Sequence, residues 1–200
     1  IHTMHHDAVL FHREVAAMKT LNHPNIVAFL DSGLSTNGHY VIVQEFVAAN
    51  NLQQLLPTLE WRPRFQSALD LVTGVCYLHG LHVPILHRDI KSANVIVKFP
   101  LHDDELSIAK LSDFGLACCF QERFFKASGD SSRSSSTKVL GTPGYIDPEL
   151  GCSGTYTQKS DVFSVGVVLM ELRTGTPASL RNYHKAAVRN EIMQEHATWT

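Results

Sequence analysis

The chain has 200 residues, a formal net charge of −2 and 44% hydrophobic residues, a composition typical of a globular domain. This small charge gives no electrostatic basis for a nucleic-acid partner, and no stretch approaches the ~20 apolar residues that span a membrane. We therefore expect neither a nucleic-acid partner nor a membrane segment in this chain. Four cysteines without metal-site or disulfide spacing favour a reducing, cytoplasmic location.

The first predicted element is an amphipathic helix over residues 7–21, which Pro24 prevents from continuing. Asp7 is its expected N-cap. Its apolar stripe consists of Phe11, Val15 and Met18. Glu14 lies beside this stripe rather than opposite it, which brings a carboxyl group close to the face that the helix is expected to bury.

A histidine cluster lies at the start of the chain and consists of His2, His5, His6 and His12. A metal-dependent hydrolase is one interpretation of this cluster. No second cluster with matching carboxylates follows in the sequence, so we favour an exposed helix start over a metal site.

Two β-branched runs follow the helix and predict a hairpin. The runs "NIVAFLDSG" and "HYVIVQEFV" flank Asn37-Gly38, a dipeptide typical of tight hairpin turns. From about Arg62 to His79 a second helix is predicted by apolar residues at helical spacing, which are Phe65, Leu69, Val72 and Cys76. Residues 86–114 are predicted to form short strands and loops.

The last third of the chain changes character twice. Residues 121–138 are rich in serine and poor in aliphatic residues, which predicts a loop. The strongly apolar segment 160–175, "SDVFSVGVVLMELRTG", predicts a helix that is buried on most sides. A helix and two strands followed by a mainly helical region predict an α+β fold rather than a doubly wound sheet.

A group of polar residues, "HRDIKSAN", directly precedes the apolar run Val95-Ile96-Val97. Together with "SDFG" and "GTPGYIDPE", in this order, it resembles the catalytic core of eukaryotic protein kinases. The resemblance covers nearly the whole chain and implies a two-lobe fold. Residues 1–48 are then the remnant of a small lobe with its hinge, incomplete and made of a helix and two strands. Residues 49–200 form a mainly α-helical large lobe that is incomplete at its C-terminal end.

The resemblance implies ATP and Mg²⁺ as cofactors and four catalytic residues. Asp89 accepts the proton of the substrate hydroxyl, and Lys91 offsets charge on the transferred phosphate and contributes to ATP binding. Asn94 and Asp113 supply oxygen ligands, which suit Mg²⁺, and are therefore both metal-binding and cofactor-binding residues. We expect these side chains to converge on one site although they are distant in the sequence.

Further residues are implied in cofactor binding and in support of the site. Glu14 matches the helix glutamate that pairs with an ATP-contacting lysine, and backbone groups of Glu45 and Phe46 are expected to hydrogen-bond adenine. Asp161 resembles the helix aspartate that braces the catalytic loop. A buried carboxylate needs donors, and the backbone N–H groups of residues 87–88 are the expected ones.

The substrate class follows from the same motifs. Lys91 in "DIKSAN" and Thr142 in "GTPGY" resemble kinases that act on serine and threonine, and the flanking segments look most like plant receptor-like kinases and the related Pelle group. This implies transfer of the ATP γ-phosphate to protein Ser/Thr hydroxyls in signal transduction. A protein substrate and ATP are the implied partners, and a parent protein with a membrane anchor is compatible with this reading.

The chain departs from the family pattern at its start. No glycine-rich phosphate loop and no strand lysine precede Glu14, so we expect the 200-residue chain by itself to be weak or inactive. The alternative function is a pseudokinase-like or truncated scaffold that binds partners without turnover. The presence of Asp89, Asn94 and Asp113 argues against it, because a scaffold does not need them.

The serine-rich segment lies where kinases carry the activation segment. Phosphate in this segment is expected to pair with Arg88, order the loop and raise activity, and the alternative is a solvated insertion. The candidate positions are Ser131, Ser132, Ser134, Ser135, Ser136 and Thr137.

Overall fold

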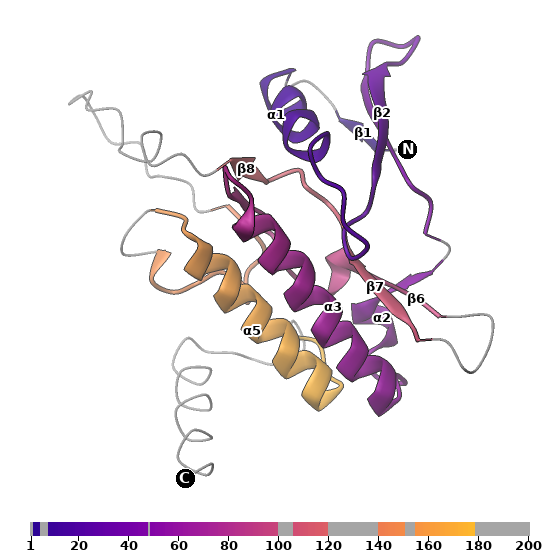
Figure 1. The fold of residues 1–200 in the computed structure, drawn as a ribbon, viewed down its shortest axis with the longest axis vertical. Coiled ribbons are helices and arrows are strands. Elements are labelled where there is room, and N and C mark those ends of the chain that lie inside the picture. The colour runs from indigo at the N-terminus through magenta and orange to yellow at the C-terminus, as the bar shows by residue number, and fades with distance from the viewer. Residues whose placement is uncertain are drawn as a thin grey trace.

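The computed structural model has two lobes, a small one built from the first part of the chain and a larger, mainly helical one (Figure 1). It describes residues 2–4, 8–47, 49–99, 106–119, 140–150 and 155–178. The expected α+β, kinase-like architecture is confirmed.

The small lobe is a three-stranded antiparallel sheet with one helix, in the strand order β1-β3-β2. Its elements are β1 (His2–Met4), α1 (Ala8–Met18), β2 (Phe29–Leu34) and β3 (Tyr40–Gln44). The predicted hairpin is confirmed, with Leu34 opposite Tyr40 and Gly38 at a φ of 76°, a conformation that glycine adopts without strain. The expected small lobe had only two strands. The third, β1, was missed because three residues without a hydrophobic pattern become a strand only through pairing with β3.

Helix α1 is shorter than the predicted span 7–21. Asp7, its expected N-cap, lies outside the described residues. The predicted apolar stripe is buried, and Phe11 stacks on Tyr40 of β3 with ring centroids 4.4 Å apart. Glu14 is buried with the stripe, at 4% exposure. The helix therefore packs on the sheet and carries one carboxyl group inward.

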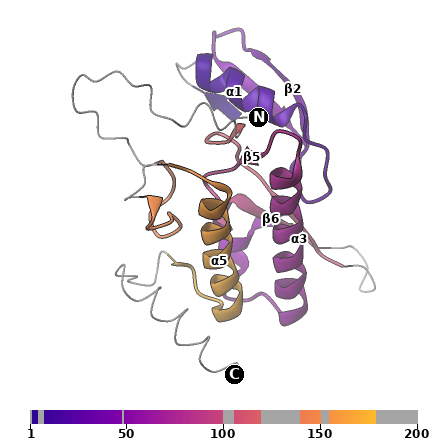
Figure 2. The same cartoon turned by 60° about the vertical axis from the view of Figure 1, so that its left-hand side comes forward.

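Two long antiparallel helices dominate the large lobe (Figure 2). They are α3 (Trp61–Gly80) and α5 (Gln158–Thr174). At one end, the Gln158 side chain donates to the His79 carbonyl at 3.0 Å. At the other end, the Arg64 guanidinium donates to the Leu172 carbonyl at 2.8 Å. The α5 helix begins at a capping box on Thr157, as a stable helix start requires.

Short elements surround these helices. They are β4 (Asn50–Asn51), α2 (Leu52–Leu55), β5 (Ile85–Leu86), η1 (Ser92–Asn94), β6 (Val95–Lys98), β7 (Ile108–Leu111) and β8 (Cys118–Cys119). Two small sheets result, β4-β6-β7 and β5-β8. The buried strand β6 directly follows the "HRDIKSAN" segment and anchors it to the core, since Val95 and Val97 are completely buried.

The face that α3 buries differs from its apolar stripe. Phe65, Leu69 and Val72, which predict the helix by their spacing, are 58%, 47% and 39% exposed. The buried face contains small and polar residues as well, and Gly74 packs so closely on Asn25 that a Cβ there would lie 3.1 Å from the Asn25 carbonyl oxygen. The periodicity predicted the helix correctly, but the buried side is the one that packs on β7, on α5 and on the small-lobe loop that contains Asn25.

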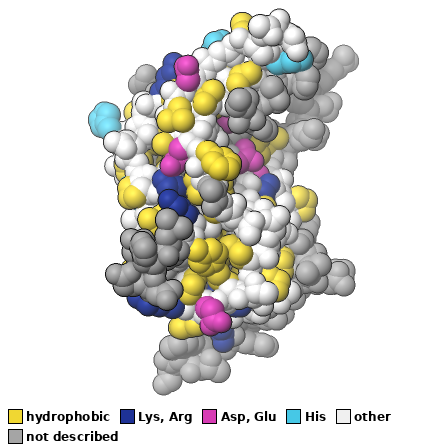
Figure 3. All heavy atoms as spheres, turned by 90° about the vertical axis from the view of Figure 1, so that its right-hand side faces the viewer, with side chains coloured by type: hydrophobic (Ala, Val, Ile, Leu, Met, Phe, Trp, Pro, Cys, Tyr) yellow, Lys and Arg dark blue, Asp and Glu magenta, His cyan; other side chains and the backbone are white. Residues whose placement is uncertain are grey.

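Charges of both signs are interspersed with hydrophobic side chains on the face shown in Figure 3, and neither sign forms a large charged patch there. Among the helices that the structure describes, none combines the length and the apolar character that crossing a membrane requires.

Candidate active site

Asp161 is hydrogen-bonded to the backbone at the start of the segment 87–94, which is here called the catalytic loop. It lies in the first turn of α5 and is 2% exposed. Its two carboxylate oxygens accept the backbone N–H groups of His87 and Arg88, each at 2.9 Å, and His79 Nε2 lies 2.9 Å from Oδ2. The expected brace is confirmed. A buried aspartate with three donors fixes the loop backbone that precedes Asp89.

His87 ties the catalytic loop to the "SDFG" segment. Its ring is fully buried, makes an edge contact with the Phe114 ring at 4.9 Å, and its Nε2 lies 3.1 Å from the Ser112 carbonyl oxygen. Burial lowers the pKa of His87, although nearby carboxylates act in the other direction. In addition, the Ser112 backbone and hydroxyl both donate to the Asn94 carbonyl at 2.9 Å. Asn94 is thus hydrogen-bonded directly to Ser112, the residue before Asp113.

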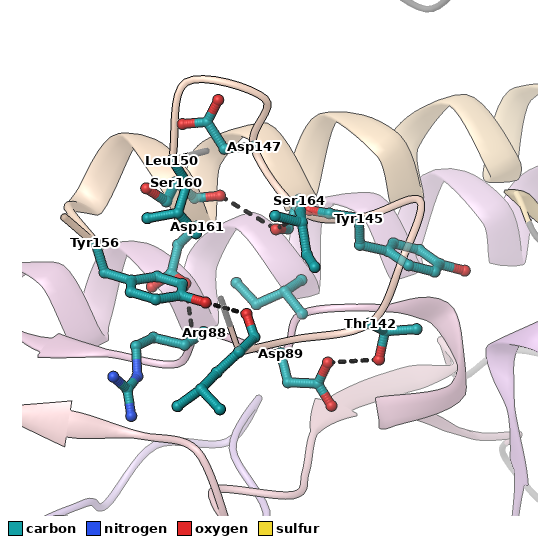
Figure 4. Close-up of a pocket in the computed structure, with 13 residues that line it drawn as sticks. Arg88, Asp89, Thr142, Tyr145, Asp147, Leu150, Tyr156, Ser160, Asp161 and Ser164 are labelled. Atoms are coloured by element: carbon teal, nitrogen blue, oxygen red, sulfur yellow. Dashed lines mark hydrogen bonds between the residues drawn. The ribbon is translucent and has the colours of Figure 1, made fainter. Parts of the chain in front are cut away.

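Asp89, Lys91 and Thr142 form a closed triangle of hydrogen bonds, of which Figure 4 shows the bond between Asp89 and Thr142. Lys91 Nζ lies 2.7 Å from Asp89 Oδ2, the Thr142 hydroxyl donates to Asp89 Oδ1 at 2.7 Å, and Lys91 Nζ donates to the Thr142 hydroxyl oxygen at 2.8 Å. Burial favours the neutral carboxyl, but the bonds from Lys91 and Thr142 outweigh it and lower the pKa of Asp89. Asp89 is therefore ionised at neutral pH and held in one orientation.

Thr142 was not among the predicted site residues. The motif "GTPGY" indicates only the substrate class. Thr142 and Asp89 are 53 positions apart, and nothing in the sequence indicates that the Thr142 hydroxyl bonds to Asp89. The residue type is the one feature that could have indicated this role, because a threonine side chain has a hydroxyl that donates a hydrogen bond and a valine of the same shape has none.

Asn94 is oriented by Asp89. Its amide nitrogen donates to the Asp89 carbonyl oxygen at 2.9 Å and lies 3.3 Å from the Asp89 carboxylate, so the amide oxygen is left for another partner. Asp113 is exposed, and its backbone has a φ of 65°, a left-handed conformation that residues other than glycine rarely adopt. The two residues offer an amide oxygen and a carboxylate, which is a donor set that fits Mg²⁺ completed by phosphate oxygens.

Glu14 lies next to this segment although it belongs to the small lobe. A Cβ added at Gly115 would be 3.3 Å from Asp113 Oδ1 and 3.9 Å from Glu14 Oε2, so both carboxylates border this glycine. Burial, together with the charge of Asp113, raises the pKa of Glu14 to about 7. Its Oε2 atom is buried and has no hydrogen-bond partner among the described residues. This environment favours a cation beside Glu14.

The segment 45–47 joins the lobes and is here called the hinge. The backbone N–H of Glu45 donates to the Ala28 carbonyl at 2.9 Å, so it is engaged in the fold and is not free for adenine. The Phe46 side chain is 90% exposed. The Glu45 carboxylate accepts from the Ala28 N–H at 2.8 Å and from Lys110 Nζ at 2.7 Å.

A small pocket lies behind Asp89 (Figure 4). Its free volume is about 10 Å³, which is room for about one water molecule and excludes a nucleotide. Arg88 borders it with a φ of 66°, donates from Nε to the Leu116 carbonyl at 2.6 Å, and stacks over the Tyr156 ring at 5.1 Å. The serines and the threonine expected to pair with Arg88 when phosphorylated lie outside the described residues.

The histidine cluster is not tested by the structure, because His5 and His6 lie outside the described residues. In the part of the chain that is described, no group of three or more His, Cys, Asp or Glu side chains is arranged to hold a metal ion.

The comparisons with known proteins agree with this geometry. A family model described as "Protein kinase domain" matches residues 2–200. The chain is 38% identical over 181 residues to the proline-rich receptor-like protein kinase PERK2, and 40% identical over 172 residues to PERK1, both from Arabidopsis thaliana. The alignments cover 87% and 82% of this chain but 23% and 24% of the two relatives, so the chain spans about a quarter of their length.

Proposed function

Because this chain belongs to the protein kinase family, we propose that its protein transfers the γ-phosphate of ATP to serine or threonine hydroxyls of other proteins. The observation that carries the proposal is the triangle of Asp89, Lys91 and Thr142. It holds an ionised carboxylate and an ammonium group 2.7 Å apart in a partly buried position of the large lobe.

Each of the three groups in the triangle has a distinct role in the proposed phosphate transfer. Asp89 accepts the proton of the substrate hydroxyl as the oxygen attacks, and its lowered pKa keeps it ready as a base. Lys91 is placed to offset negative charge on the transferred phosphate. Thr142 fixes the carboxylate, so that the accepting oxygen does not have to reorient during the reaction.

Asn94 and Asp113 are the residues that would hold Mg²⁺, which supplies charge neutralisation on the nucleotide phosphates. The adenine would be recognised by hinge backbone groups other than the Glu45 N–H, since that donor is engaged. Glu14 would pair with a cationic side chain that contacts the phosphates. Its buried, unpartnered oxygen supports that role.

The printed names of the relatives support further parts of the proposal. We propose a role in signal transduction on the cytoplasmic side of a receptor, as a receptor-like kinase, with ATP and a Ser/Thr-containing protein as partners. The kinase is favoured over the scaffold alternative, because the relatives are kinases by name and Asp89, Lys91, Asn94 and Asp113 are all present.

The test is phosphate transfer to a protein substrate by the full-length protein and by its Asp89→Asn variant. Removing a general base reduces turnover by roughly 10²–10⁴-fold, so we expect a loss in this range with a nucleotide affinity close to that of the unaltered protein. Asp31→Asn, on an exposed β2 position remote from the site, is the matched control. Equal turnover in the Asp89→Asn and Asp31→Asn variants would contradict the proposal.

A further inference from the structure

One ion pair joins the hinge to the strand that leads into Asp113. Between described residues, the two lysine–carboxylate ion pairs are Lys91–Asp89, within the catalytic loop, and Lys110–Glu45, which spans the lobes. Lys110 Nζ lies 2.7 Å from Glu45 Oε1. The two side chains are 18% and 29% exposed, so the pair is shielded from water on most sides.

The pair lies in a junction where small-lobe backbone pairs with the large lobe. The Val27 N–H donates to the Leu111 carbonyl at 3.0 Å, and the Leu111 N–H donates to the Asn25 carbonyl at 2.9 Å. Glu45 is bonded twice to Ala28 in the same loop, through its backbone and through its carboxylate. Lys110 lies on β7, three positions before Asp113. The junction therefore connects the hinge to the segment that contains Asp113.

The electrostatics of the junction favour the ionised form of Glu45. Burial favours the neutral form of Glu45, but the bonds from Lys110 and the Ala28 N–H, with the charge of Lys98, outweigh it and lower the pKa of this carboxyl. The pKa of His23 is lowered by burial and by the charge of Lys110.

We propose that Glu45 and Lys110 are a positioning pair that sets the spacing between the hinge and Asp113, and thereby the affinity for ATP. This rests on the proposed function, in which the hinge holds the adenine end and Asp113 the metal-bound phosphate end of one nucleotide. A ligand that must reach both ends at once is sensitive to their separation, whereas a ligand that occupies only one end is not.

The experiment uses charge reversal in the full-length protein: Glu45→Lys, Lys110→Glu and the double variant that restores the pair in the opposite sense. Affinities are measured for ATP with Mg²⁺, for adenosine alone, and for inorganic triphosphate with Mg²⁺. The matched control is Lys98→Gln, which removes a nearby exposed charge without removing a bond to Glu45.

We expect each single reversal to weaken ATP binding by about tenfold, as losing a shielded charge-assisted bond does, with adenosine and triphosphate affinities changed less than about twofold. The double variant is expected to bind ATP more tightly than either single variant, with partial recovery because a lysine at position 45 restores the ion pair but cannot accept the Ala28 N–H. The Lys98→Gln control is expected to leave all three affinities unchanged.

Three results with the variants would overturn the positioning role. An unchanged ATP affinity in both single variants is one. An equal loss of adenosine affinity is another, since it would make the pair part of the adenine site itself. A double variant as weak as the singles is the third. An unaltered protein that binds none of the three ligands would overturn the role together with the proposed function. If the protein binds ATP but Asp89→Asn leaves phosphate transfer unchanged, the proposed function fails, and the affinity comparison still decides the role of the pair.

Discussion

Thr142 donates to Asp89 across 53 positions of sequence and shows how single side chains are assembled at this site. Arg88 and Asp113 show the backbone cost of the same assembly. Both have left-handed φ values, 66° and 65°, which cost of order 1–3 kcal/mol each in residues other than glycine. Next to these backbones, the Arg88 N–H donates to Asp161 Oδ1 at 2.9 Å, and Asp113 Oδ1 accepts the Gly115 N–H at 3.3 Å.

The Thr142 hydroxyl gives a prediction at this scale. Thr142→Val keeps the shape but removes the donor to Asp89 and the acceptor for Lys91. A hydrogen bond to a charged group contributes roughly 1.5–3 kcal/mol, so we expect turnover to fall by about tenfold to a hundredfold. Steady-state phosphate transfer measures this in the full-length protein. Thr142→Ser, which keeps the hydroxyl, should retain most of the activity, and an equal loss in both variants would speak against the hydrogen bond as the cause.

At the scale of elements, the pairing of α3 with α5 is maintained at one end by Arg64. Its guanidinium donates to the carbonyls of Leu56, Leu59 and Leu172 at 2.9, 2.7 and 2.8 Å. Gly175 ends α5 with a φ of 69°, and a Cβ at this position would lie 2.9 Å from Arg64 Nη2. The helix end thus depends on glycine for its conformation and for the space that it leaves to the arginine.

Gly175→Ala is therefore expected to destabilise the chain. The strained φ and the displacement of Arg64 together cost about 1–3 kcal/mol in free energy of unfolding. Gly166→Ala is the matched control within α5, because no atom lies within 4 Å of a Cβ there and alanine favours a helix interior by about 0.5–1 kcal/mol. Urea denaturation of both variants measures the two effects, which should have opposite signs. A stable Gly175→Ala variant would show that the helix end tolerates a side chain.

At the scale of the whole molecule, Glu14 lies where the lobes meet. It is carried by α1 of the small lobe and lies close to Asp113 of the large lobe, with its pKa raised from 4.5 to about 7. A raised pKa means that the folded chain prefers the protonated carboxyl. The contribution of Glu14 to stability is then fully present below pH 4.5 and is lost as the pH rises to about 7.

The corresponding prediction compares the chain with its Glu14→Gln variant, without nucleotide or metal. His87 has a lowered pKa and acts in the opposite direction over an overlapping range, so the difference between the two proteins isolates Glu14. At about pH 4, below the unfolded pKa of the carboxyl, their free energies of unfolding should be similar. At pH 8 the variant should be more stable by about 3 kcal/mol, at about 1.4 kcal/mol per unit of pKa shift. Denaturation curves at several pH values measure this, and parallel pH profiles would refute it.

Several features were predictable because their cause is local. Residues at helical spacing predicted α1 and α3, Asn37-Gly38 predicted the hairpin, and the residues of "HRDIKSAN" and "SDFG" indicated the chemistry through their types alone. The exposed stripe of α3 and the third strand β1 were not predictable in this way. Which face of a helix is buried, and whether three residues pair as a strand, depend on partners that are distant in sequence.

The sequence by itself determined which chemical groups are present and the local structure around them: the carboxylate of Asp89, the lysine at position 91, the oxygens of Asn94 and Asp113, two long helices and a hairpin. Only the tertiary structure decided that the Glu45 N–H is engaged by Ala28, that Thr142 bonds to Asp89, and that Lys110 reaches Glu45. The physical reason is that a hydrogen bond or an ion pair depends on distances of about 3 Å in space. Separation along the chain does not encode those distances.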